Sequence, residues 1–411
     1  MECREMNGDH VPRAWLIVGV LWIVAVLNYL DRNMVTTMRD SLTQAIPMSD
    51  AQFGLLTSVF LWVYAFFSPL TGFLADRFRR THLILGSLLV WSLLTWLTGH
   101  ARTFEQLLAA RALMGLSEAA YLPAALALIA DLHRGPTRSL ATGIHMTGFS
   151  VGTGLGGLGG WIAEHHGWNS AFSVFGLFGV AYAAALCLVL REPPREDAAA
   201  SAEKPRAGEA LASLLGNRSF LLLLAFWGLL ALAGWAVIGW MPTYFKEQFH
   251  LAQGAAGLSA TSCLAVAMFV GKIGGGACAD RWSRTNPRAR ILVPAIGLFI
   301  AAPAAFLVAK TSVLAFAIAG LSFYGLTRSF SDANLMPILC QVVDSRYRAT
   351  GYGLMNFCAT AIGGVTIYLG GVLRDAHLNV ATLFQTAAAG LLVCALLLLA
   401  VRPVTNAPRI P

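Results

Sequence analysis

Ionisable side chains stand inside long apolar stretches of this 411-residue sequence, where charge is costly and usually functional. Besides Lys272, which can extend to a membrane surface, they form three pairs: Asp31 and Arg32, Arg111 and Glu118, and Arg328 and Asp332. The members of the second pair are two helical turns apart and those of the third are one turn apart, so each pair shares a helix face. Carboxylates and guanidinium groups at such depth predict a site that handles protons and anions.

Glu118 and Asp31 are the predicted proton-coupling residues. A carboxylate in a low-dielectric cavity resists ionisation, so it can take a proton on one side of a membrane and release it on the other. Arg111 should lie at a depth similar to that of Asp31 and steer it. The alternative is that Asp31 and Arg111 form an internal ion pair that holds two helices in register.

Arg32 and Arg328 are predicted to bind an anionic substrate, because a guanidinium group grips a carboxylate or phosphate with two hydrogen bonds. Protonation of one embedded carboxylate would leave a surplus positive charge, which a bound anion would neutralise. Arg328 and Asp332 are equally compatible with a purely structural ion pair. The full set of predicted substrate-binding residues is Arg32, Arg111, Arg328, His145, Tyr64, Asn334 and Asn356.

The elements that carry these residues are predicted to be membrane-spanning helices. The sequence is 57% hydrophobic and only 12% charged, whereas soluble domains are about 25% charged. Apolar stretches of about 20 residues, long enough to cross a bilayer, recur twelve times. They cover residues 14–38, 52–75, 81–100, 104–131, 139–163, 169–190, 219–245, 254–279, 290–309, 312–341, 348–372 and 380–401. The fold class expected is an all-α membrane protein.

The basic residues predict the orientation of this protein in the membrane. Most of the 29 Lys and Arg residues fall in segments on the same side of the membrane as the two termini. Because basic residues concentrate on the cytoplasmic side, both termini are predicted to lie in the cytoplasm, with the chain in the cell inner membrane. The net charge of +8 is thereby explained by the basic residues that set the orientation of the helices in the membrane. Nucleic-acid binding would require a soluble basic domain, and the sequence predicts none. Residues 191–218, rich in charge, Pro and Ala, are predicted to be a cytoplasmic linker between an N-terminal half, 1–190, and a C-terminal half, 219–411.

The two halves share motifs at corresponding places, which indicates a duplicated six-helix unit. The predicted gating residues follow the second and eighth stretches: Gly72, Asp76 and Arg77, then Gly276, Asp280 and Arg281. The glycine allows close approach of two helices. The aspartate can cap a helix or bind an arginine of its own loop or of the other half, and so latch the cytoplasmic side.

These motifs, the twelve stretches and the central linker resemble the major facilitator superfamily over the whole chain. The resemblance implies two pseudo-symmetric six-helix halves, alternating access and a cavity lined by helices 1, 4, 7 and 10. Most of the embedded charges fall on three of those helices.

Two branches of that superfamily resemble this chain in the segment Asn28–Arg32 and in the Arg111 and Glu118 pair. One is the organic anion:cation symporter branch, which takes up sugar acids with protons. There the matching positions imply protonation at Asp31 and Glu118 and anion contact at Arg32. The other is the Spinster branch, which moves lysolipids and sphingoid lipids and shares the same charged pairs.

The sequence after Glu118 is closer to the Spinster branch, whereas the polar residues of stretches ten and eleven favour a small hydrophilic anion. We therefore expect proton-coupled symport of a small organic anion such as a sugar acid, with a Spinster-like lipid transporter as the alternative. A receptor or scaffold that does not transport is the third possibility.

The sequence predicts neither an enzyme nor a metal or cofactor site. Its seven cysteines are odd in number and contain no C-x-x-C, so they are expected to be small apolar residues. The expected partners are the bilayer, protons and an anionic small molecule, with no nucleic acid, and the expected state is a monomer.

Overall fold

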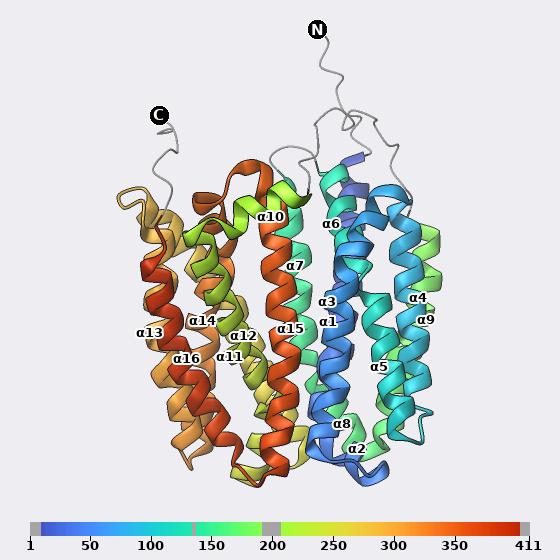
Figure 1. Ribbon diagram of the computed structural model, residues 1–411. Coiled ribbons are helices and arrows are strands. Elements are labelled where there is room, and N and C mark those ends of the chain that lie inside the picture. Colours follow the sequence, from blue (N-terminus) through green and yellow to red (C-terminus); the bar gives the residue numbers. More distant parts are fainter. Residues whose placement is uncertain (1–9, 134–136, 191–206, 403–411) are drawn as a thin grey trace.

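The chain folds into a bundle of long helices that lie roughly parallel to one another (Figure 1). The computed structural model describes residues 10–133, 137–190 and 207–402. The N-terminal elements are α1 (His10–Thr37), α2 (Arg39–Ala45), α3 (Asp50–Arg77), α4 (Arg80–Thr98), α5 (Phe104–Glu118), α6 (Tyr121–Leu132), α7 (Arg138–Leu155), α8 (Gly157–His166) and α9 (Trp168–Val189). The C-terminal elements are α10 (Ala207–Leu215), α11 (Arg218–Phe249), α12 (Gln253–Ser283), α13 (Ala289–Lys310), α14 (Leu314–Val342), the 3₁₀ turn η2 (Ser345–Tyr347), α15 (Arg348–Asp375) and α16 (Val380–Ala400).

Ten of these segments are long and apolar enough to cross a membrane. Two predicted stretches are not among them. Residues 139–163 form α7 and α8, which are separated at Gly156, and residues 312–341 form α14, which carries Arg328 and Asp332. The predicted linker 191–218 also contains a helix, α10, which packs against α11 and α15.

Polar side chains define where several helices begin. Ser49 and Gln52 form a reciprocal capping box at the start of α3, and Asn217 accepts two backbone N–H groups at the start of α11. Such caps satisfy amide groups that have no partner within the helix. The helix starts are therefore fixed locally, while packing decides how the helices meet.

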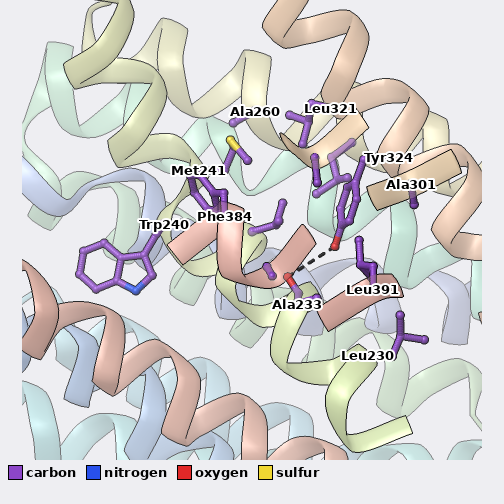
Figure 2. Close-up of a cluster of buried hydrophobic side chains, with 14 of the residues drawn as sticks. Leu230, Ala233, Trp240, Met241, Ala260, Ala301, Leu321, Tyr324, Phe384 and Leu391 are labelled. Atoms are coloured by element: carbon purple, nitrogen blue, oxygen red, sulfur yellow. Dashed lines mark hydrogen bonds between the residues drawn. The ribbon is translucent and has the colours of Figure 1, made fainter. Parts of the chain in front are cut away.

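The elements α1–α9 and α11–α16 occupy opposite sides of the bundle, as Figure 1 shows. The two sides meet mainly where α15 runs along α3 and where α12 runs along α7 and α8. Within the C-terminal side, Figure 2 shows a core in which the Tyr324 hydroxyl donates to the carbonyl of Ala233, between α14 and α11, at 3.4 Å. This core holds α11, α14 and α16 as one packed unit.

The two sides are joined at one end of the bundle, which we call the far end because α1 begins and α16 ends at the other. Among the described residues, the hydrogen bonds between α3 and α15 extend from the far end no further than Trp62, whose indole donates to Ala361. Those between α12 and the pair α7 and α8 extend no further than Ser262, which donates to Gly154. On α3, one turn after Trp62 and further from the far end, Phe66 is 71% exposed. The bundle is therefore closed at the far end.

Candidate functional site

A buried ion pair links α1 to α5 in the middle of the N-terminal half. Arg32 donates to Oε2 of Glu118 through Nε at 3.2 Å and through Nη2 at 3.1 Å. Asn28, one turn before Arg32, donates to the same oxygen at 2.9 Å and accepts from Arg32 at 3.2 Å. All three residues are at most 6% exposed. The sequence placed Arg111 on the same helix face as Glu118, but the salt-bridge partner of Glu118 in the structure is Arg32.

Glu118 stands where the helix is interrupted. It is the last residue of α5, and α6 resumes at Tyr121 after a short turn. Pro123, four residues after Ala119, has no N–H to donate to the Ala119 carbonyl, which accepts a hydrogen bond from Thr71 of α3 at 2.8 Å instead. Gly115, one turn earlier, packs so closely on α3 that a Cβ there would meet the Phe60 carbonyl. Small residues that permit such approach and hydroxyl groups that satisfy freed carbonyls stabilise broken membrane helices.

Asp31 and Arg111 lie in the same region but do not form the ion pair that the sequence suggested as an alternative. Asp31 accepts a hydrogen bond from Thr95 of α4 at 3.2 Å, and its other oxygen, Oδ1, has no hydrogen-bond partner among the described residues. Arg111 donates to the Leu56 carbonyl at 3.3 Å and lies 4.7 Å from the centre of the Phe60 ring. Arg111 thus stays within electrostatic reach of Asp31 without contacting it.

Aromatic rings surround the Arg32 guanidinium. Its central carbon is 4.9 Å from the Tyr29 ring centre, 4.9 Å from that of Phe60 and 4.5 Å from that of Tyr64. Such rings stabilise a cation through their negative faces. Tyr64, predicted from sequence to contact substrate, therefore lies against the predicted anion-binding arginine.

The C-terminal half contributes a second ion pair on α14. Arg328 bonds to both oxygens of Asp332, at 3.3 and 3.1 Å, and its guanidinium lies against Gly234 of α11. The two side chains are 12% and 18% exposed, so this pair is less enclosed than the Arg32–Glu118 pair. Asp332 is within electrostatic reach of Tyr29 on α1, so this pair lies near the N-terminal half.

The remaining predicted substrate residues are dispersed. His145 is completely buried against the rings of Tyr121 and Phe149, and neither of its nitrogens has a hydrogen-bond partner among the described residues. Asn334 is 2% exposed and donates to the carbonyl of Gly275, so it links α14 to α12. Asn356 is partly buried on α15. The structure therefore groups Tyr64 with the central charges and sets His145 and Asn334 into helix packing.

The predicted gating motifs are only partly described. Gly72, Asp76 and Arg77 lie in the last turns of α3, and their side chains are outside the described residues. Asp280 pairs with Arg290 of its own half at 3.1 Å and is 70% exposed, while Arg281 is exposed. Gly276 was expected to allow close helix approach, but a Cβ added there would lie 3.8 Å from the Ala333 methyl, which is an ordinary contact. The tight contact with α14 is made by Gly271 and Gly275 instead.

Six alternating charges, which sequence reasoning missed, join the two halves at the far end. Five ion pairs link them in series, and we call the set a ring because its end members, Lys246 and Glu247, are adjacent in the sequence. Its members, in order, are Lys246, Asp40, Arg39, Asp50, Arg374 and Glu247. Two of its ion pairs cross between the halves: Lys246 with Asp40, and Arg374 with Asp50 at 3.0 Å. The sequence signal that could have revealed these ion pairs is that acidic residues stand next to the few basic residues of these segments.

Two further contacts strengthen this closure. The carboxylate of Asp375 accepts the backbone N–H groups of Asp50 and Ala51, at 2.8 and 2.9 Å, so one half caps the first turn of α3 in the other. Beneath the ring, Phe53 of α3 meets Trp240 of α11 edge to face. Charge pairing, helix capping and apolar contact therefore coincide at the far end.

Comparison with known proteins gives the family. The sequence matches the Major Facilitator Superfamily over residues 21–368. Protein spinster homolog 1 of Homo sapiens is 31% identical over 398 residues, which cover 90% of this chain and 75% of that protein. Protein spinster homolog 1 of Xenopus laevis is 29% identical over 398 residues, with 91% and 75% covered.

A solved structure shares the fold. The crystal structure of a bacterial homolog to the human lysosomal transporter Spinster, inward-facing and unoccupied, has a TM-score of 0.76 at 22% identity, over 95% of this chain and 96% of that one. The chain is a multi-pass membrane protein that belongs to the Major Facilitator Superfamily of transporters and, within it, to the Spinster branch.

Proposed function

We propose that this chain is a proton-coupled transporter of single-chain lipids with a charged head group, such as lysolipids or sphingoid lipids. Membership of the Spinster branch favours this substrate class over the sugar acid that the polar residues of stretches ten and eleven suggested. The observation that carries the choice is the burial of two of those residues, Asn334 and Ser329. Asn334 and Ser329 are 2% and 0% exposed, and Asn334 is bonded to α12, so they are poor candidates for lining a hydrophilic cavity.

The proposed coupling site is the Arg32–Glu118 pair with Asp31 beside it. Protonation of Glu118 would remove the negative partner of Arg32 and leave a positive charge that an anionic head group neutralises. Arg328, on the opposite half, would bind the same head group, with Tyr64 beside Arg32. Binding by both halves would draw them together and drive alternating access.

The proposed membrane arrangement has twelve spans, in which α7 with α8 and α14 complete the ten apolar segments. The division into 1–190, a linker 191–218 and 219–411 follows from it. We place both termini in the cytoplasm of a cell inner membrane, so the closed far end faces outward. The protein is proposed to act as a monomer.

The test is a pH-dye assay in reconstituted vesicles. Purified protein is challenged with lysolipids, sphingoid bases, sugar acids and small carboxylates, beside a Glu118→Gln variant. We expect proton entry with a lipid, and the variant to lose it while it still exchanges lipid without a proton gradient. Proton entry with a sugar acid alone would replace the lipid proposal with the organic anion symporter. No flux with any compound, from protein that binds lipid, would indicate a receptor.

A further inference from the structure

The two oxygens of the Glu118 carboxylate are in different environments. Oε2 receives hydrogen bonds from Nε and Nη2 of Arg32 and from Nδ2 of Asn28, at 3.1 to 3.2 Å and 2.9 Å. Oε1 is buried and has no hydrogen-bond partner among the described residues. A carboxylate oxygen that already accepts three donors has no free lone pair for a proton, so the asymmetry decides where a proton can bind.

Asn28 contacts both members of the ion pair at once. Its amide nitrogen donates to Glu118, and its amide oxygen accepts from Arg32 at 3.2 Å. A neutral side chain that bridges the two charged groups fixes the rotation of the carboxylate, because turning it would break the Asn28 and Arg32 bonds together. Asn28 is 2% exposed, so water does not compete for these bonds.

We propose that Asn28 is a positioning residue for coupling, which holds Glu118 so that its proton is taken up and released at Oε1. This inference rests on the proposed function, because it assigns an atom and a second residue to the same coupling step. The proton enters from solvent and binds Oε1, which becomes the hydroxyl of a neutral carboxylic acid. Oε2 becomes the carbonyl oxygen and keeps its donors, while Arg32 loses its counter-charge.

The charged and titratable groups that face Glu118 are few and come from three helices. Arg32, Asp31 and Tyr29 lie on α1, Arg111 on α5 and Tyr64 on α3. Every one of them carries charge or can titrate, so replacing it would change the electrostatic balance as well as the geometry. Asn28 can be replaced with no change in charge, which makes its role separable.

The deciding experiment compares Asn28→Ala with Asn33→Ala. Asn33 is the matched control: it lies on α1, is 5% exposed and donates to the Tyr29 carbonyl at 2.7 Å, but has no hydrogen bond to Glu118. We expect the midpoint pH of proton-driven lipid uptake to rise by about one unit in Asn28→Ala, because the charged carboxylate loses a donor. Asn33→Ala should keep the midpoint of the unmodified protein.

A second measurement needs no transport. Infrared difference spectra between low and high pH should show the carbonyl stretch of the protonated Glu118, identified by its loss in Glu118→Gln. In Asn28→Ala this band should move to higher frequency, because the carbonyl oxygen Oε2 has lost a donor. An unmoved band and an unmoved midpoint would overturn the role of Asn28.

The two proposals fail in distinguishable ways. If uptake by the unmodified protein is independent of pH, proton coupling is wrong, and the infrared band alone then decides how Asn28 acts on Glu118. If the unmodified protein responds to pH and both asparagine variants share its midpoint, coupling stands and only the positioning role is lost.

Discussion

Arg32 and Glu118 form a salt bridge between two buried side chains, and neither forms another salt bridge with a described residue. Removing one member of a buried pair leaves an uncompensated charge and costs about 3–5 kcal/mol, whereas removing both is much less costly. We expect Arg32→Gln to lower the thermal unfolding midpoint in detergent strongly and Arg32→Gln with Glu118→Gln to recover most of the loss. Arg290→Gln, which removes an exposed pair with Asp280, is the control and should change little. Equal losses in the single and double variants would contradict the pairing.

The ionisable residues of this site could be predicted from the sequence, whereas the partner with which each forms an ion pair could not. Ionisable residues at membrane depth identified Asp31, Arg32 and Glu118, and the structure brings these three together. The partner of Glu118 could not be predicted, because it depends on how α1 is rotated against α5. Asn28 was missed for the same reason: a neutral amide in an apolar stretch carries no signal until its partners are known.

Close packing of α12 against α14 depends on individual glycines. A Cβ at Gly271 would meet the Leu326 backbone, whereas one at Gly274 would meet nothing within 4 Å. We expect Gly271→Ala to destabilise the protein by about 1–3 kcal/mol, because the main chain of α14 must move. Gly274→Ala should be neutral or stabilising by up to about 1 kcal/mol, since alanine favours helix. Thermal unfolding of the two variants, in detergent and in lipid, makes the comparison. Equal destabilisation would show that this contact is not tight.

Helix existence was predictable, and helix interruption was only partly so. Hydrophobic length located the segments, because a bilayer requires about 20 apolar residues. The six glycines between Gly152 and Gly160 gave a signal for the break at Gly156 between α7 and α8. The break after Glu118 also had a signal, because Pro123 has no N–H to donate to the carbonyl of Ala119 four residues earlier. What the sequence did not show is that Thr71 satisfies that carbonyl instead.

The far-end ring predicts how the whole molecule opens. Asp40→Asn and Lys246→Gln should each increase the share of molecules open at the far end, by up to about fivefold for a partly exposed ion pair. The double variant should open no further than either single one, because the same bond is lost. Spin labels at Gln44→Cys on α2 and Gln248→Cys on α11, in a cysteine-free background, report the distance between the halves.

The control for that measurement is Arg290→Gln, since its pair with Asp280 lies within one half. Additive opening in the double variant would mean that Asp40 and Lys246 act through other groups. The sequence predicted two halves that move against each other and a latch at the glycine–aspartate motifs on the cytoplasmic side, but it did not predict a second latch at the far end. Which charged residues pair between the halves depends on which end of the bundle is closed. A sequence does not specify one conformation of a transporter, so these pairs could not be predicted from it.

The ring also makes the resting conformation responsive to the surrounding electrolyte. Lys246 and Glu247 are 36% and 47% exposed, so dissolved ions can reach the ring. Opening leaves Arg39 paired with Asp40 and Asp50, and Arg374 paired with Glu247, so neither half exposes an isolated arginine. Salt weakens accessible ion pairs within a Debye length of about 8 Å at physiological ionic strength. Salt added on the far side of the membrane should therefore favour opening, whereas the same salt on the other side should leave the ring intact.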